Sequence, residues 1–133
     1  MRTYDLVQAY TDYIDCLNAR DWATLERHVA GEVEHNARRL GLAGYRAMLE
    51  EDVRQIPDLR FNAELLVNGA DHVACRLAFD CTPAGMFLGL PVNGQRVRFY
   101  EHVFYRFREG KIVEVWSLLD RAAIEQQVNA RQV

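Results

Sequence analysis

Cysteine is scarce in this chain, and its arrangement argues against the covalent and metal centres that stabilise many small proteins. Only three of the 133 residues are cysteines, Cys16, Cys75 and Cys81, and no two of them stand in a Cys-x-x-Cys spacing. The odd number and the spacing argue against a disulfide framework and a zinc knuckle. The four histidines show no His-x-x-x-His arrangement, so we expect buried free thiols and no metal site.

The sequence also lacks a long apolar run and a strong charge of one sign. The first ten residues, MRTYDLVQAY, include polar side chains, so we expect neither a signal peptide nor a membrane span, and we place the protein in the cytoplasm. The net charge is −3, and the 16 Lys and Arg residues are scattered. A nucleic-acid interface needs a concentrated basic patch. The expected partner is therefore a small molecule or another protein.

The composition that is present suits one compact domain. Half of the residues are hydrophobic and 26% are charged, as in a single domain, here residues 1–133, with a sizeable core. Apolar residues at three- and four-residue steps predict helices over residues 4–17 and 43–56, and Pro57 ends the second. Asp21 is a candidate N-cap for a short helix whose apolar side carries Trp22, Leu25 and Val29.

Beyond Pro57 the apolar period changes from about 3.6 to 2, which indicates strands. The turn signals Asn68-Gly69 and Glu109-Gly110 join two antiparallel pairs, and a last helix follows over 121–128. In the first strand Phe61, Ala63, Leu65 and Val67 form the expected buried face. The four predicted strands cover residues 61–67, 73–81, 95–107 and 112–119. Helices followed by strands indicate an α+β fold, in which a long twisted sheet curls over the helices around a conical cavity.

The connection between the two strand pairs, residues 82–94, is long and apolar for a surface loop. Loops of this length in compact domains tend to be functional. Three interpretations remain open: a lid at the mouth of the cavity, a segment folded over the core, or a contact with a second subunit.

The strand over residues 95–107 has two different faces, and one of them lines the cavity. Glu101 shares its face with apolar side chains, whereas His102 shares the other with Arg98. If the apolar face points inward, Glu101 is the lone carboxylate there and His102 points outward, into a dimer contact. If the other face points inward, His102 joins Arg98 and Asp120 in a cluster that binds and polarises a carbonyl. We favour His102 as the site residue.

Asp120 stands where the last strand meets the last helix. Two-residue alternation places Trp116, Leu118 and Asp120 on one face, so an apolar wall would adjoin the acid and favour its protonated form. The competing role is that of a helix N-cap, for which aspartate is a preferred residue. Both roles hold together only if one carboxylate oxygen caps the helix while the other faces the cavity.

Several short motifs occur together in one order along the chain, and with them the sequence resembles a known family. The family is that of the SnoaL-like polyketide cyclases, within the nuclear-transport-factor-2-like superfamily of cone-shaped α+β domains. The motifs are Val33-Glu34-His35, Pro57-Asp58-Leu59, Thr-x-x-Gly-x-Phe-x-Gly-x-Pro-x-x-Gly over 82–94, Tyr105-Arg106-Phe107 before Gly110-Lys111-Ile112-Val113-Glu114, and Trp116 to Asp120 before Gln126-Gln127. This superfamily carries several activities on one scaffold.

The resemblance implies an enzyme without a cofactor that acts on a small hydrophobic, carbonyl-bearing molecule. Asp120 would be the acid and base of an aldol-type ring closure, or of a related isomerisation or dehydration, and His35 would stand at the pocket. A homodimer through the outer face of the sheet is also implied. The residues expected to contact the substrate are Tyr13, Met86, Phe87, Arg98, Glu101 and Trp116. The chain departs from the family at Pro83, where a histidine is common, so a non-catalytic ligand-binding or dimerisation domain remains the alternative.

Overall fold

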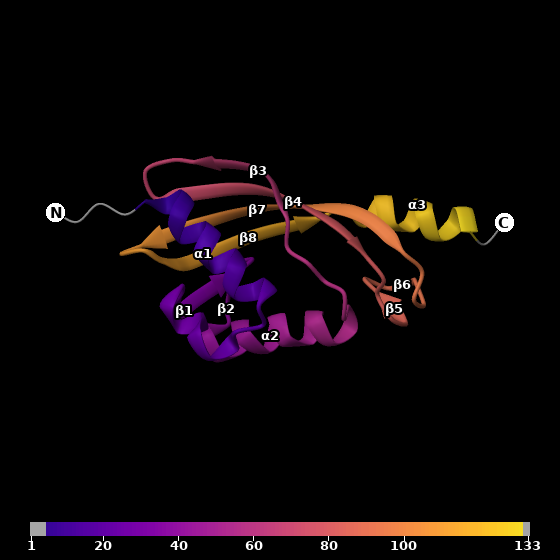
Figure 1. The fold of residues 1–133 in the computed structure, drawn as a ribbon, viewed down its shortest axis with the longest axis horizontal. Coiled ribbons are helices and arrows are strands. Elements are labelled where there is room, and N and C mark those ends of the chain that lie inside the picture. Colours follow the sequence, from indigo (N-terminus) through magenta and orange to yellow (C-terminus); the bar gives the residue numbers. More distant parts are fainter. Residues whose placement is uncertain (1–4, 132–133) are drawn as a thin grey trace.

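A curved six-stranded sheet, with helices against its inner side, forms the architecture of the protein (Figure 1). The structure is a computed structural model that describes residues 5–131. The strand order is β2-β1-β8-β7-β4-β3, and every neighbouring pair is antiparallel except β1 and β8, which are parallel. The strands are β1 (Val29–His35), β2 (Arg38–Arg39), β3 (Ala63–Asn68), β4 (His72–Cys81), β7 (Val97–Arg108) and β8 (Lys111–Leu119). The α+β prediction, with a curved and mostly antiparallel sheet, is confirmed.

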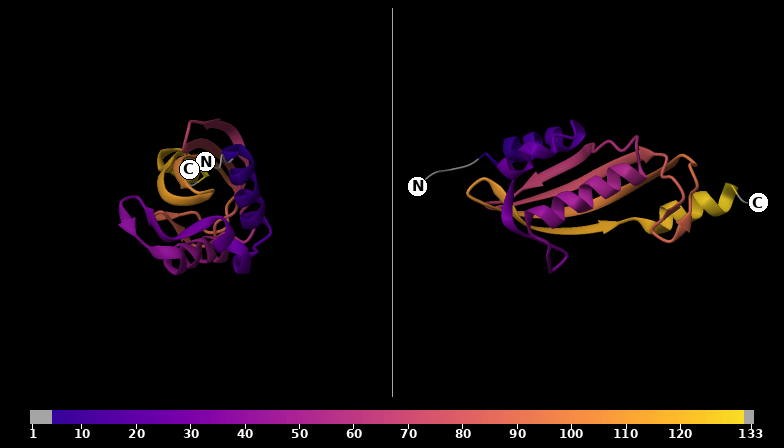
Figure 2. Two further views of the ribbon diagram at one scale, coloured as in Figure 1. Left: turned by 90° about the vertical axis from the view of Figure 1, so that its left-hand side faces the viewer. Right: turned by 90° about the horizontal axis from the view of Figure 1, so that it is seen from below.

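Two long helices cover the inner side of the sheet, and a third extends past its end. They are α1 (Leu6–Asn18), α2 (Gly41–Gln55) and α3 (Arg121–Arg131). The end-on view in Figure 2 shows the sheet curling, with α1 and α2 on its inner side. Asp5 accepts a hydrogen bond from the Gln8 backbone nitrogen at 3.1 Å, which fixes the start of α1. The predicted helix over 4–17 is thus confirmed from Leu6 onward, with Asp5 as its cap, and Tyr4 lies outside the described residues.

The short helix expected after Asp21 is a 3₁₀ helix, η1 (Trp22–Arg27), and the Asp21 side chain makes no capping hydrogen bond there. Val29 does not continue it, because β1 begins at that residue. The stretch that ends at His35 is also part of β1. Its burial does not alternate in steps of two, and its register with β8 shifts between Val29 and Glu34. A strand with this irregular pattern gives no local sequence signal.

The predicted hairpins are confirmed, but one buried face is not. In β4 the alternation of buried residues is regular, and Asn68 pairs with Val73 around the turn. The prediction that Ala63, Leu65 and Val67 lie on a buried face is wrong, since all three are exposed, Leu65 and Val67 by 58% each. The β3–β4 register shifts between Ala63 and Leu65. A one-residue shift of this kind turns the following side chains to the opposite face.

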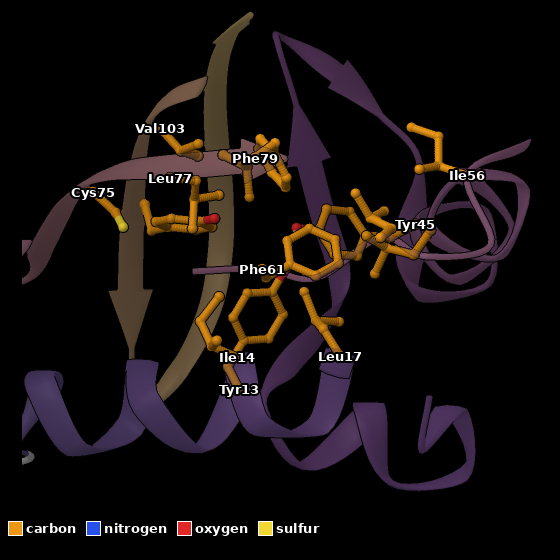
Figure 3. Packing of buried hydrophobic residues seen from close by; sticks show 14 of the residues in the cluster. Tyr13, Ile14, Leu17, Tyr45, Ile56, Phe61, Cys75, Leu77, Phe79 and Val103 are labelled. Carbon is orange, nitrogen blue, oxygen red and sulfur yellow. The ribbon is translucent and has the colours of Figure 1, made fainter. Parts of the chain in front are cut away.

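The core lies between the helices and the inner face of the sheet. Figure 3 shows part of it, where Tyr13 and Leu17 from α1 meet Tyr45 from α2 and side chains from β4 and β7. All three cysteines are buried and free, as expected from the sequence. Within residues 5–131, no helix combines the length and apolar character needed to cross a membrane.

Candidate functional site

The orientation of β7 determines which side chains line the interior. Its buried residues are Val97, Phe99, Val103, Tyr105 and Phe107, and Glu101 shares their side, whereas His102 and Phe104 are exposed on the other. The more apolar face therefore points inward. The preference for the His102 face as the cavity wall is wrong, because burying five large apolar residues outweighs burying the face that carries His102, Arg98 and Arg106.

A cavity of about 110 Å³ lies inside the cone. This volume is below the roughly 300–1,000 Å³ of typical drug-sized ligand sites, so it suits a small ring or fragment. Its wall is apolar except for two carboxyl groups, Asp52 and Glu101. The other lining residues are Ile56, Leu59, Phe61, Phe79, Phe87, Leu88, Phe99 and Leu119.

Glu101 is the carboxyl group on the sheet side of the cavity. The sheet register places it between Leu77 of β4 and Leu119 of β8, so its neighbours across the strands are apolar. Its Oε2 accepts a hydrogen bond from Ser117 Oγ, and no hydrogen bond reaches Oε1 from the described residues. Burial is the largest cause that raises the pKa of Glu101, with a contribution from the charge of Asp52, while the Ser117 hydrogen bond lowers it.

Asp52 faces the same cavity from the last turns of α2. Burial, with a smaller contribution from neighbouring Glu51, raises the pKa of Asp52 to about 6. Within the described part of the chain, its carboxylate has no side-chain hydrogen bond and no ion pair with Arg, Lys or His. A carboxyl group of this kind is about half protonated near pH 6, which is a property of acid–base groups in active sites.

Four tyrosines form a buried hydroxyl cluster near the two carboxyl groups. The Tyr13 and Tyr45 hydroxyls are 2.7 Å apart, and the Tyr10 hydroxyl donates to that of Tyr105 at 3.3 Å. Burial raises the pKa of Tyr13, Tyr45 and Tyr105, and the charge of Glu101 contributes to each of the three shifts. These hydroxyls therefore stay neutral and remain available as hydrogen-bond donors. Tyr13, expected to contact the substrate, belongs to this cluster and is not among the residues that line the cavity.

The loop over residues 82–94 closes one end of the cavity. It forms a small separate sheet of β5 (Met86–Phe87) and β6 (Leu90–Pro91). Phe87 is buried against Phe99, with ring centroids 5.9 Å apart, and lines the cavity together with Leu88. Arg121 Nε donates to the Leu88 carbonyl at 2.9 Å, and the Gln55 side chain donates to the Met86 carbonyl. The loop thus packs over the cavity, while the Met86 side chain is exposed.

Asp120 and His102 lie together, but on the outside of the sheet. Both line an open groove of about 440 Å³ with Arg76 and Tyr100. Asp120 Oδ1 accepts a hydrogen bond from the Ala123 backbone nitrogen at 3.2 Å, so it caps α3. Trp116, Leu118 and Asp120 share one face as predicted, yet that face is exposed. The expectation of an apolar, enclosed environment for Asp120 is therefore wrong.

The remaining predicted site residues are dispersed. His35 is half-buried, 6.3 Å from the Tyr45 ring between centroids, and burial is the main cause that lowers its pKa. Arg98 pairs with Asp80 at 3.2 Å on the surface. Trp116 stacks on His72 with ring centroids 6.2 Å apart. Of the predicted site residues, Glu101 and Phe87 line the inner cavity.

Sequence reasoning missed Asp52, although the sequence contains a signal for it. The apolar stripe of α2 includes Tyr45, Leu49 and Ile56 at steps of four and seven residues, and Asp52 falls on the same stripe. Burying a carboxylate on the inner side of a helix costs free energy unless a hydrogen-bond or ion-pair partner compensates for it. A carboxylate on such a stripe is therefore a candidate functional group. Within residues 5–131, no group of three or more His, Cys, Asp or Glu side chains is placed to hold a metal ion.

Comparisons with known proteins identify relatives across almost the whole chain. A family model described as SnoaL-like polyketide cyclase matches residues 7–128. A crystal structure from Agrobacterium tumefaciens, described as a SnoaL-like polyketide cyclase, is 54% identical to this chain with a TM-score of 0.91. The match covers 96% of this chain and 98% of that one. A comparison with curated protein sequences gives no match.

More distant crystal structures share the architecture. IdmH from Streptomyces antibioticus is 20% identical, with a TM-score of 0.82 over 95% of this chain and 99% of its own. TsrD from Streptomyces laurentii is 23% identical, with a TM-score of 0.79 over 92% of this chain and 93% of its own. At these identities the likeness shows the fold alone.

Proposed function

The chain belongs to the SnoaL-like polyketide cyclase family, and we propose that it is a cofactor-independent acid–base enzyme whose reaction takes place inside the cone. The substrate is a small hydrophobic molecule with a carbonyl group. The reaction is an aldol-type ring closure or a related isomerisation or dehydration. The observation that supports this proposal most is Glu101, a largely buried carboxyl group on the wall of an otherwise apolar cavity.

The chemistry requires a group that moves a proton at the carbon next to a carbonyl. Removing this proton leaves an enolate, whose carbon attacks a second carbonyl of the same molecule during ring closure. The new alkoxide then takes up a proton from the enzyme. Each proton transfer is helped by a carboxyl group whose pKa lies close to the working pH, in a site that contains little water. Glu101 is suited to such a proton transfer because apolar residues surround it and burial raises its pKa.

Asp120 is less suited than Glu101 to proton transfer, although the family resemblance points to Asp120. Its carboxylate is exposed and one oxygen already caps α3. The groove it shares with His102 is open and lies on the outer face of the sheet. We therefore assign the acid–base role to Glu101 and leave Asp120 with the cap.

Exchange of α-protons for deuterium tests the proposal without knowledge of the natural substrate. Cyclohexanone is incubated with the protein in D₂O, and loss of the α-proton signal is followed by NMR. We expect exchange above that of buffer and of heat-denatured protein, a loss of about 100-fold or more in Glu101→Gln, and an unchanged rate in Asp120→Asn. Loss in Asp120→Asn with an unchanged rate in Glu101→Gln would reverse the assignment. No exchange by the wild-type protein contradicts the enzymatic proposal and favours the non-catalytic binding domain.

We also propose a homodimer through the outer face of the sheet. Five large apolar side chains are exposed there, on three strands: Leu65, Val67, Phe104, Trp116 and Leu118. An exposed apolar patch on a sheet is typical of a surface that another protein covers. The occupant implied by the family resemblance is a second copy of this chain. The three free buried thiols suit a reducing compartment, so we place this dimer in the cytoplasm.

A further inference from the structure

We propose that Asp52 is a second catalytic residue, and that Asp52 and Glu101 act as a carboxyl pair in which Asp52 is the base and Glu101 the acid. This inference rests on the proposed function and specifies the chemistry of the same cavity. It narrows the substrate to a ketone or aldehyde with a removable proton on the adjacent carbon. The reaction would begin with conversion of that carbonyl compound into its enol.

The placement of the two groups carries the assignment. They come from opposite walls of the cone, Asp52 from α2 and Glu101 from β7, and both line one cavity of about 110 Å³. The rest of the lining is apolar, and no Lys, Arg or His side chain is among the lining residues. A small molecule inside this cavity would therefore have a carboxyl group on each side.

The hydrogen bonds leave the reactive oxygens free. The carboxylate of Asp52 has no side-chain partner within the described residues, so both of its oxygens can accept a proton. Ser117 Oγ donates to Glu101 Oε2. When Glu101 is protonated, its proton is thus expected on Oε1, the oxygen that no described donor reaches. A neutral carboxylic acid in this arrangement can donate to a carbonyl oxygen of the substrate.

The order of ionisation agrees with these roles. The negative charge of Asp52 contributes to the raised pKa of Glu101, whereas the groups that raise the pKa of Asp52 are burial and Glu51. This asymmetry is that of a pair in which Asp52 loses its proton first and its charge then opposes ionisation of Glu101. In the proposed pair Asp52 gives up its proton before Glu101, so the singly protonated pair carries its proton on Glu101.

The first step balances without a further reactant. The Asp52 carboxylate takes the proton from the α-carbon, and the C–H electron pair forms the carbon–carbon double bond of the enol. The carbonyl oxygen receives the proton of Glu101 Oε1, so an O–H bond forms as another breaks. The substrate gains and loses one proton, and the charge passes from Asp52 to Glu101. Return of the protons at other positions completes an isomerisation, while attack by the enol carbon on a second carbonyl completes a ring closure.

Other titrating groups near the pair do not replace either role. Tyr13, Tyr45 and Tyr105 have pKa values raised by burial, as does Cys75, so they stay neutral across the pH range of the reaction. Glu51 is exposed on α2 and pairs with Arg54. The rate is therefore expected to rise with pH as Asp52 ionises near pH 6 and to fall at higher pH as Glu101 loses its proton.

Two measurements on the full chain test the pair. The first is the pH dependence of cyclohexanone deuterium exchange in the wild type, Asp52→Asn, Glu101→Gln and the control Glu50→Gln, an exposed carboxyl on the same helix. We expect Asp52→Asn to lose about 100-fold or more and to lack the rise near pH 6. Glu101→Gln should keep that rise but lack the fall at high pH, and Glu50→Gln should match the wild type. Thermal unfolding shows that each variant is folded.

The second measurement needs no substrate and keeps the pair testable if the ketone is not accepted. Carboxyl ¹³C shifts of labelled protein report the titration of each group. We expect Asp52 to titrate near pH 6, Glu101 to titrate with a raised pKa, and Asp52→Asn to lower the pKa of Glu101 because a negative charge is removed. Independent titration of both groups near their ordinary values overturns the pair. If Glu101→Gln is inactive while Asp52→Asn keeps the wild-type profile, the pair fails although the proposed function stands.

Discussion

Replacing Asp52 by asparagine should stabilise the protein at neutral pH, because the Asp52 carboxylate is charged there and lies in a largely apolar cavity. Burial raises the pKa of Asp52 from 3.8 to about 6. A raised pKa means that ionisation is harder in the folded than in the unfolded chain, so the charge destabilises the fold above pH 6 and the penalty disappears below about pH 4. At about 1.4 kcal/mol for each pKa unit, the full penalty is about 3 kcal/mol.

Urea unfolding at intervals between pH 4 and pH 8 measures this penalty. The free energy of unfolding of Asp52→Asn should exceed that of the wild type by about 2–3 kcal/mol at pH 8, by nearly as much near pH 6, by roughly half as much near pH 5, and by little at pH 4. Glu50→Gln serves as the control, because an exposed ion pair on the same helix contributes less than about 1 kcal/mol. A difference between Asp52→Asn and the wild type that does not change with pH would refute this account of the buried carboxyl.

Three further substitutions test the dimer interface, the cap of α3 and a hydrogen bond in the core, one feature each. Leu118→Glu places a charge on the most exposed side chain of the outer apolar face, so light scattering should give half the wild-type mass, and an unchanged dimer would contradict that interface. Asp120→Ala should lower the free energy of unfolding by about 1 kcal/mol through loss of the α3 cap, while Asp120→Asn should not, and equal losses would argue against capping. Tyr13→Phe leaves the Tyr45 hydroxyl without its 2.7 Å partner and should cost about 1–3 kcal/mol in urea unfolding; no loss would mean that Tyr45 finds another partner.

The elevated pKa of Asp52 and its proposed role have one physical origin. An apolar wall that excludes water makes the charged form costly, and the same wall brings the carboxyl group into the pH range where it exchanges protons readily. A salt bridge would remove the penalty, but it would also lower the pKa of Asp52 out of that range. The proposed role of Asp52 therefore predicts that the wild-type protein is less stable at neutral pH than the Asp52→Asn variant.

The sequence by itself determined the elements whose signal is local. Helix α1 was readable from apolar steps of three and four, β4 from strict alternation, and the hairpin turns from Asn68-Gly69 and Glu109-Gly110. Each pattern depends on residues within one turn of helix or one side of one strand, where backbone geometry fixes which side chains share a face. The motif order also identified the family, and hence the fold.

Only the tertiary structure decided which faces look inward. Alternation separated Glu101 from His102, but the direction of each depended on where α1 and α2 pack against the sheet. The parallel pairing of β1 with β8, and the meeting of Asp52 with Glu101, join segments far apart in the chain. No local period in the sequence encodes such contacts. The free energy of burial depends on all the surfaces that pack together, and each strand or helix contributes only one of these surfaces.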